Sequence, residues 1–497
     1  MRTFEIITIM LLFTAWVSYL VPKANHPRWL VIFPALAVLM AIVQLIVEQY
    51  RWQMVPAYTL AVILFISCVP QLLSKAAAKP VGIGYWIIHI AGIVLSFAAI
   101  VIATALPILF PVFHLPEPTG SNAVGTTSFE WVDKSRPELF TPEPDDYRSL
   151  FVQVWYPAEM IAGTKPLPMW PEAKTSSPLI AKLLGMPGFL FNHLELIQSH
   201  TYHNLPLAKT QSIYPVLVFS HAYIFGYPAQ NLVQMEELAS HGYVIFSIAH
   251  PYEAAAVIYP DGRVVTANRQ QYKAFRDSTI KAVPILKQYI AATTPVDKER
   301  LFRQYLKTNS AQGSVKTWVK DTLFVLNKIE QISHGEITSL LSGHLDLNRV
   351  GILGHSMGGA VTGEVCMRDS RFKAGVNLDG IQIGYVIDGS IGQPFMMMYS
   401  TVNVGQNDLL YNRGHNQLYR LIVANTTHND YCDLPLISPL FKTLRQSGSI
   451  NAYRMETIIN SYLLAFFDKY LRGSDAPLFN KPESGFPEVD LQIRNTD

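Results

Sequence analysis

The chain has 497 residues, enough for two or three domains of ordinary size. Its formal net charge of +2 gives no reason to expect nucleic acid or another strongly charged partner. Only eight of its 39 basic and 37 acidic residues precede Pro116. The first part is therefore expected in a membrane, and the rest is expected to form a water-soluble globule. Three cysteines are too few for a disulfide framework and leave open whether Cys366 and Cys432 pair.

Residues 1–113 contain four apolar stretches that we predict to be transmembrane helices. A bilayer requires about 17–25 apolar residues in a helix. A cleaved signal peptide is the alternative for the first stretch, but Glu5 lies in what would be its basic region and three more stretches follow. We therefore expect an integral, multi-pass region. The predicted helices are 4–20, 29–47, 55–73 and 81–109.

The distribution of basic residues predicts the orientation of these helices. The first and third loops carry four basic residues, against two at the N-terminus and in the second loop. Because cytoplasmic loops are enriched in lysine and arginine, we expect these two loops in the cytoplasm. Both termini and the soluble region are then outside it, with the chain in the cell membrane. The residues compared are Lys23, Arg28, Lys75 and Lys79 against Arg2 and Arg51.

His89 lies inside the fourth stretch, and an ionisable residue in a membrane helix is by default a functional hypothesis. No second ionisable group lies at a similar depth in these stretches. We therefore interpret His89 as a neutral imidazole hydrogen-bonded to a neighbouring helix.

Strand and helix patterns alternate after a proline-containing linker at residues 114–124. Short apolar runs at Tyr214–Ser220 and Tyr243–Ala249 are typical of strands that are covered on both faces. This alternation predicts a mostly parallel sheet with helices on both faces over residues 125–497. Further strands are predicted at 126–132, 149–156, 349–353, 374–378, 394–399 and 419–424, and a helix at 230–240.

Two predicted insertions interrupt this pattern. Residues 270–344 have helical spacing with mixed charge. Residues 157–212 are rich in proline, leucine and aromatic residues and lack strand periodicity. The second of these segments is either a lid or lipid-contact surface, or a segment packed onto the sheet.

The stretch Gly354-His355-Ser356-Met357-Gly358 has the spacing of a nucleophile elbow. An apolar strand leads into it, and small residues suited to a helix start follow it. The flanking glycines fit this turn, because side chains there would collide with neighbouring backbone. The pattern predicts that Ser356 is a nucleophile, the alternative being a serine in an ordinary strand–helix turn.

A serine nucleophile requires a base and an acid that orients the base. In α/β-hydrolases these follow the serine in the order acid, then histidine. Asp379 ends the next predicted strand and should reach the same sheet edge as Ser356, so we prefer it to Asp369 and Asp388. His428 follows a later strand and is the preferred base. The histidines set aside are His415, which precedes that strand, and His334 and His344, which precede the serine.

Ester hydrolysis also requires hydrogen-bond donors for the developing oxyanion. The backbone N–H of Met357, directly after the nucleophile, is one predicted donor. The N–H of Tyr223, in the loop "SHAYIFG" after an earlier strand, is the second. We interpret His221 as a structural histidine that holds this loop.

The segments "GHSMGGA", "NLDG", "FSHAY", "LASHGYVIFSIAH" and "THNDYCD" together resemble the platelet-activating factor acetylhydrolase family of the lipoprotein-associated phospholipase A2 type. The resemblance extends from about residue 125 to about residue 468. It implies calcium-independent hydrolysis of short or oxidised sn-2 acyl esters of phospholipids. It also implies a catalytic triad and two oxyanion amides: Ser356, Asp379 and His428, with Tyr223 and Met357.

The chain departs from the family pattern in three respects. It has Ala222 in place of a glycine, Met357 in place of an aromatic residue, and a membrane region that secreted members lack.

The sequence therefore predicts an α/β-hydrolase fold preceded by a four-helix transmembrane region. We expect a membrane-anchored serine ester hydrolase that forms an acyl-Ser356 intermediate and acts on lipid-like esters. No P-loop, dinucleotide-binding glycine pattern or Cys/His cluster occurs, so no metal or cofactor is expected. Two alternatives stay open. One is a general carboxylesterase or polyester hydrolase acting on non-lipid esters, and the other is a membrane sensor or binding protein with an inactive hydrolase fold.

Overall fold

The computed structural model describes residues 1–20, 28–73, 82–143, 145–183, 185–413, 417–480 and 485–494. The chain divides into two compact units. The first contains Met1–His114 with the short segments Phe191–Ile197 and Ile437–Leu440. The second contains Leu115–Leu190, Gln198–Leu436 and Phe441–Asp497. Four residues that the sequence argument used lie outside the described residues: Lys23, Lys75, Lys79 and His415.

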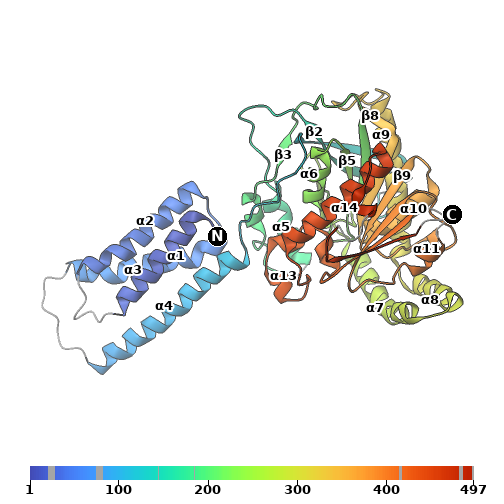
Figure 1. Cartoon of the computed structure of the whole chain (residues 1–497). Helices are drawn as coiled ribbons and strands as arrows, with labels where there is room; N and C mark the ends of the chain where they lie inside the picture. Colours follow the sequence, from blue (N-terminus) through green and yellow to red (C-terminus); the bar gives the residue numbers. More distant parts are fainter. Residues whose placement is uncertain are drawn as a thin grey trace. The chain divides into compact units, whose positions relative to one another are not determined.

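The described residues before His114 form four α-helices, labelled α1 to α4 in Figure 1. Their shared core is built largely of small and aliphatic side chains, among them Ala15, Ala37, Ala57, Ala61 and Ala103. Small residues allow helices to approach closely, as in membrane bundles. Large apolar side chains such as Ile63, Ile88 and Leu95 point outward and are exposed. The helices are α1 (Thr3–Tyr19), α2 (Ile32–Val47), α3 (Val55–Leu73) and α4 (Ile83–Leu109).

Three of these helices are long and apolar enough to cross a membrane, so the prediction of four spans was too high by one. Helix α1 has 17 residues. At a rise of 1.5 Å per residue it is about 25 Å long, which is less than the roughly 30 Å of a bilayer core. The predicted stretch 4–20 also has 17 residues, which is the lower limit of the range used to predict a span. The three candidate spans are Trp29–Val47, Trp52–Val69 and Ile83–Leu109.

A buried ion pair lies where α1 and α3 begin and α4 ends. Arg51 donates two hydrogen bonds of 2.6 Å to the carboxylate of Glu5, and both side chains are fully buried. Arg51 also donates to the carbonyl of Phe110 at 2.6 Å. Arg2 donates to Glu5 at 2.7 Å. The sequence pattern treats Arg2 and Arg51 as loop charges, whereas the structure pairs both of them with carboxylates.

His89 of α4 is buried, and its ring stacks on Tyr85 with a centroid separation of 5.5 Å. Its expected role as a neutral structural imidazole stays a prediction.

The second unit is built around a ten-stranded sheet with the order β12-β11-β10-β9-β8-β4-β5-β2-β1-β3. The neighbouring strands from β5 through β4 and β8 to β11 run parallel, and β2 and β12 join them antiparallel. The predicted mostly parallel sheet is therefore confirmed. The strands are β1 (Ala123–Pro137), β2 (Tyr147–Ala158), β3 (Thr201–His203), β4 (Tyr214–Ser220), β5 (Val244–Ala249), β8 (Leu345–His355), β9 (Phe372–Leu378), β10 (Phe395–Ser400), β11 (Leu418–Val423) and β12 (Val489–Arg494). A separate two-stranded sheet contains β6 (Ala256–Ile258) and β7 (Val264–Thr266).

Helices cover both faces of the large sheet. The helices α6 (Leu232–Ser240) and α14 (Ala452–Arg472) lie on one face. On the other face are α9 (Ala311–Ser333) and α10 (Met357–Arg368). Successive residues of strand β8 point to opposite faces of the sheet. On one face, a Cβ on Gly351 would lie 2.8 Å from Phe467 of α14. Its neighbours Val350 and Ile352 belong to the core that contains side chains of α9 and α10.

The predicted insertions contain further helices, and short helices lie after them in the chain: α11 (Asp408–Arg413), α12 (Leu434–Ile437), α13 (Leu440–Thr443) and α15 (Pro477–Asn480). Residues 270–344 are largely helical, as expected, and contain α9 with α7 (Arg269–Ala291) and α8 (Pro295–Thr308). Residues 157–212 contain α5 (Ala173–Leu183) and β3. In this segment Leu183 packs against the main core, whereas Met186 and Phe189 are exposed. Packing and exposure therefore both occur there.

The order of the strands creates a switch point between β4 and β8. From β4 the chain continues to β5 on one side, and from β8 it continues to β9, β10 and β11 on the other. In open α/β sheets, ligands bind outside the carboxyl ends of the strands at such a point. Strand β4 ends at Ser220 and β8 at His355. The residues that follow these two strands therefore lie where a reaction site is expected.

Candidate active site

Ser356 lies in a sharp turn between β8 and α10. Its backbone has φ 60° and ψ −116°, a conformation that a residue other than glycine rarely adopts. A Cβ on Gly358 would lie 2.0 Å from the carbonyl oxygen of Ser220. A Cβ on Gly354 would lie 2.4 Å from the carbonyl of Gly358. Glycines on both sides of the serine are therefore required by close backbone contacts, as the sequence pattern predicted.

The structure brings Ser356, His428 and Asp379 together. The distance from His428 Nε2 to Ser356 Oγ is 2.9 Å. The distance from His428 Nδ1 to Asp379 Oδ2 is 2.8 Å. A carboxylate can only accept, so Nδ1 carries the proton and Nε2 is free to accept the hydroxyl proton of Ser356. The side chain of His428 is 39% exposed, which leaves this end of the array open to a substrate.

Asp379 is held by three donors besides His428. It accepts from the backbone N–H of Ser400 at 2.6 Å and from its hydroxyl at 2.9 Å. The side-chain amide of Asn403 donates to it at 2.6 Å. These bonds stabilise a negative charge on a side chain that is almost completely buried. Neither residue was predicted, although Ser400 ends β10 at the sheet edge from which Asp379 emerges.

The residues that the sequence argument set aside have other partners. Asp369 pairs with Arg371, and Asp388 pairs with Arg303, each at 2.5 Å. His334 follows the last residue of α9, and His344 donates to the carbonyl of Ser212 at 2.9 Å. Ser356 hydrogen-bonds to none of these four side chains.

The predicted oxyanion donors are the N–H groups of Met357, directly after the nucleophile, and of Tyr223, in the loop after β4. Met357 is the first residue of α10, where a backbone N–H has no partner within the helix. Among the described residues, neither the N–H of Met357 nor that of Tyr223 donates a hydrogen bond. The ring of Tyr223 is buried against Phe275, at a centroid separation of 4.5 Å. Ala222 does not have a positive φ, so alanine is accommodated there without backbone strain.

His355 and Gln230 link this loop to the histidine loop. The side-chain amide of Gln230 donates to His355 Nδ1 at 2.6 Å, and His355 Nε2 lies 3.2 Å from the carbonyl oxygen of His428. The two histidine rings stack at 4.8 Å. Burial, and then the proximity of His428, holds the pKa of His355 well below its usual range. The sequence indicated His355 only as a member of the elbow and did not indicate Gln230.

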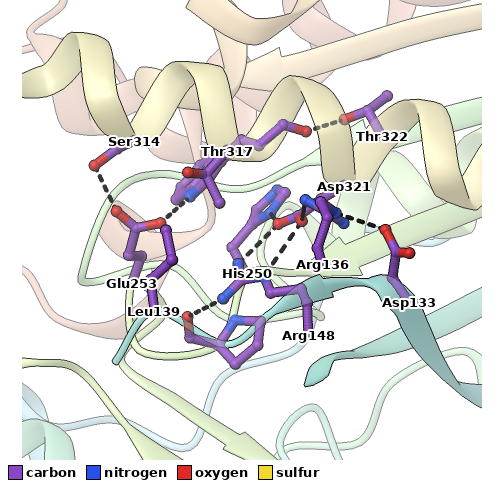
Figure 2. A network of polar contacts seen from close by, with 12 residues as sticks. Asp133, Arg136, Leu139, Arg148, His250, Glu253, Ser314, Thr317, Asp321 and Thr322 are labelled. Atoms are coloured by element: carbon purple, nitrogen blue, oxygen red, sulfur yellow. Dashed lines mark hydrogen bonds and ion pairs between the residues drawn. The ribbon is translucent and has the colours of Figure 1, made fainter. Parts of the chain in front are cut away.

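Ser220, His250 and Asp321 form a second Ser–His–Asp array, and Figure 2 shows its histidine and aspartate with the two arginines that contact Asp321. His250 Nε2 is 2.9 Å from Ser220 Oγ, and His250 Nδ1 is 2.9 Å from Asp321. Asp321 also accepts from Arg148 and Arg136, each at 2.8 Å. Ser220, His250 and Asp321 are fully buried, so no substrate can reach this serine. Burial lowers the pKa of His250 to about 4, and the array is structural.

A cavity of about 330 Å³ lies beside the far end of the loop that carries Tyr223. Its lining includes Trp155, Trp170, Glu172 and Tyr227 but no residue of the Ser356–His428–Asp379 array. The cavity is therefore separate from the reacting atoms.

The three cysteines are buried and form no disulfide, so Cys366 and Cys432 do not pair.

The elbow at the switch point, with an acid and a histidine after later strands, defines the chain as an α/β-hydrolase. The family model described as "Platelet-activating factor acetylhydrolase, isoform II" matches residues 110–481. The chain belongs to this family and is an ester hydrolase, which confirms the resemblance seen in the sequence.

The individual relatives have low sequence identity to this chain, but the matches extend over most of its length. "Platelet-activating factor acetylhydrolase" from Cavia porcellus is 24% identical over 350 residues, covering 65% of this chain and 73% of that protein. "Probable 1-alkyl-2-acetylglycerophosphocholine esterase" from Arthroderma benhamiae is 23% identical and covers 80% of this chain and 97% of that one. The solved structure of a ferulic acid esterase from Streptomyces cinnamoneus has a TM-score of 0.59 and 24% identity. It covers 77% of this chain and all of that one, and it supports the α/β-hydrolase fold.

Proposed function

We propose that the chain cleaves carboxylic esters through an acyl-Ser356 intermediate. The observation that carries this proposal is the pair of distances, 2.9 Å and 2.8 Å, that join Ser356 to His428 and His428 to Asp379. Hydrogen-bond reach from nucleophile to base and from base to acid is the arrangement that activates a serine hydroxyl.

In the first half of the proposed reaction, Ser356 Oγ attacks the ester carbonyl carbon while His428 Nε2 takes the hydroxyl proton. The carbonyl oxygen becomes an oxyanion and accepts hydrogen bonds from the N–H groups of Tyr223 and Met357. The ester C–O bond then breaks, and His428 returns its proton to the leaving alcohol. The acyl group remains on Ser356.

In the second half, His428 takes a proton from a water molecule that attacks the acyl carbon. The second tetrahedral intermediate uses the same two N–H groups. Collapse of this intermediate returns the proton from His428 to Ser356 Oγ and releases the carboxylic acid. Asp379 keeps His428 in the required tautomer and stabilises the imidazolium in both halves.

The proposed substrates are phospholipids with short or oxidised sn-2 acyl chains. The names of the relatives support this class, since one is named for 1-alkyl-2-acetylglycerophosphocholine. The apolar N-terminal helices support it further, because an enzyme held in a membrane is close to lipid. A general carboxylesterase acting on non-lipid esters is the second candidate, because the fold alone fits esterases of other specificity.

We propose that the helices anchor the chain and that the hydrolase unit is on the extracytoplasmic side. Arg2 and Arg51 are paired with carboxylates at one end of the helices. Four basic residues are assigned to the opposite loops in the sequence, where no acidic residue accompanies them: Lys23, Arg28, Lys75 and Lys79. The positive-inside tendency then favours those loops in the cytoplasm.

The test compares hydrolysis by the full chain in lipid nanodiscs of a 2-acetyl phospholipid, its long-chain analogue and an aryl acetate. We expect the 2-acetyl phospholipid to have the highest kcat/KM. Ser356→Ala and His428→Ala should abolish activity, whereas His334→Ala, at an exposed histidine, should not. Preference for the aryl acetate would favour the general carboxylesterase. Failure to hydrolyse any ester and to react with a fluorophosphonate would favour an inactive sensor.

A further inference from the structure

Ala222 lies directly before Tyr223 and is held by hydrogen bonds on both sides. His221 Nδ1 is 2.7 Å from the carbonyl oxygen of Ala222. The N–H of Ala222 donates to the side-chain oxygen of Gln230 at 2.9 Å. Both peptide groups that flank this residue therefore have a fixed orientation.

The protonation state of His221 follows from an obligatory donor. The backbone N–H of His250 donates to His221 Nε2 at 3.1 Å. Because a backbone N–H can only donate, Nε2 has no proton and the imidazole is neutral. The proton is then on Nδ1, which donates to the carbonyl oxygen of Ala222.

This bond sets the direction of the N–H that follows it. The peptide bond between Ala222 and Tyr223 is trans, because no cis peptide bond occurs in the described chain. In a planar trans peptide the N–H points opposite to the C=O. With the carbonyl of Ala222 held by His221, the N–H of Tyr223 points away from the buried histidines. This is the amide with no acceptor in the described chain.

Closely packed residues surround the hydrogen bond between His221 and Ala222. A Cβ on Gly226 would lie 2.3 Å from the carbonyl oxygen of Ala222 and 2.5 Å from His221 Nδ1. The ring of His221 lies edge-on to Trp318, at a centroid separation of 5.0 Å. His221 is fully buried, and its ring also contacts that of His250 at a centroid separation of 5.2 Å.

The other side of Ala222 is tied to the catalytic histidine loop. Because the oxygen of Gln230 accepts from Ala222, its amide nitrogen is the group that donates to His355 Nδ1. His355 must then donate from Nε2 to the carbonyl of His428. One chain of hydrogen bonds thus runs from the Tyr223 loop through the elbow to the base.

We propose that His221 and Gln230 are positioning residues that aim the N–H of Tyr223 at the oxyanion and fix its loop relative to His428. The inference rests on the proposed function, since it requires the N–H of Tyr223 to be an oxyanion donor. A misdirected donor weakens transition-state binding more than substrate binding, so kcat falls and KM changes little.

The test uses His221→Phe, which keeps the shape of the ring and removes its donor. We expect kcat per fluorophosphonate-titrated site to fall about 100-fold, as for loss of one oxyanion donor, with KM within threefold. His221→Asn places an amide near the Nδ1 position, so its kcat per titrated site should be at least tenfold higher than that of His221→Phe. Affinity for a trifluoromethyl ketone, which forms an oxyanion on the nucleophile, should fall in parallel with kcat/KM. Gln230→Leu, which removes the second contact, should also lower kcat per site.

The matched control is Tyr156→Phe, which removes a fully buried hydrogen bond of 2.7 Å to the carbonyl of Leu205. It should leave kcat per titrated site unchanged. If His221→Phe lowers only the fraction of titratable sites, and kcat per site stays within threefold of wild type, the inference is overturned and the proposed function stands. If the wild-type chain hydrolyses no ester, the proposed function fails and the inference with it.

Discussion

At the residue scale, the reaction site depends on backbone contacts that tolerate no added atom. The carbonyl of Ser220 approaches Gly358 so closely that the turn at Ser356 can form only without a side chain there. The sequence indicated Ser356, Asp379 and His428 because each follows a predicted strand, and ends of parallel strands meet at one edge. It did not indicate Ser400, Asn403 or Gln230, whose positions depend on loop conformations that a local pattern does not contain.

Gly358→Ala tests this requirement. The added Cβ would lie 2.0 Å from backbone that cannot move aside, so we expect a loss of stability on the order of 3 kcal/mol and loss of esterase activity. The matched variant is Gly313→Ala in α9, where a Cβ meets nothing within 4 Å. It should raise stability by about 0.5–1 kcal/mol. Thermal unfolding measures the stability of each variant, and an ester hydrolysis assay measures its activity. Equal stability and equal activity of the two variants would contradict the steric argument.

At the element scale, buried polar contacts join segments that are distant in the sequence. Glu5 of α1 pairs with Arg51, which precedes α3, and Asp321 of α9 pairs with His250, which directly follows β5. Sequence periodicity predicted most of the strands and helices but not these pairings. It missed β3, whose three residues are too few for an alternation pattern, and β12, an edge strand with exposed alternate residues. It also counted α1 as a span, because its 17 residues lie at the lower limit of the length that a bilayer requires.

The Glu5–Arg51 pair makes a prediction about the first unit. Arg51→Leu removes the fully buried partner of Glu5 and leaves only Arg2, which is partly exposed, beside the carboxylate. It should destabilise the unit by up to about 3–5 kcal/mol. Replacing both residues by leucine should cost less, since no buried charge remains. The stabilities of the single and double variants are compared by unfolding the full chain in detergent with increasing concentrations of dodecyl sulfate. A single variant at least as stable as the double variant would show that the pair is unimportant.

Buried His250 makes a prediction about pH. The pKa of an unfolded histidine is about 6.5, and burial lowers the pKa of His250 to about 4. As pH falls from 6.5 towards 4, the unfolded state binds a proton that the folded state does not. The free energy of unfolding should therefore fall, by up to about 3 kcal/mol from this group.

The effect of His250 is measured as the difference in pH dependence of unfolding between wild type and His250→Asn. Buried carboxyls act in the opposite direction, since burial raises the pKa of Asp433 to about 7. They are present in both proteins and cancel in the difference. Wild type should lose more stability on acidification than the variant, and parallel curves would contradict the assignment.

At the scale of the whole molecule, the chain joins a set of apolar helices to a hydrolase unit. The sequence indicated this division well, because charged residues are scarce before Pro116 and frequent after it. Hydropathy alone did not give the number of spans. The sequence of neither unit predicts the substrate, because enzymes that act on many kinds of ester have a nucleophile elbow.

The proposed orientation is tested by labelling single cysteines in intact cells with a membrane-impermeant maleimide. Lys134→Cys, at an exposed position of β1, should be labelled without permeabilisation. Lys75→Cys should be labelled only after permeabilisation. The parent chain is the control, because its three cysteines are buried. The reverse pattern would place the hydrolase unit in the cytoplasm.

The central claim is that Ser356 carries the acyl group during ester hydrolysis. The most direct measurement is peptide mass spectrometry of the full chain, quenched in acid during turnover of a 2-acetyl phospholipid. We predict one acetyl group on the peptide that contains Ser356, and none on that peptide in Ser356→Ala. Turnover without an adduct on Ser356, or with one on another residue, would contradict the account.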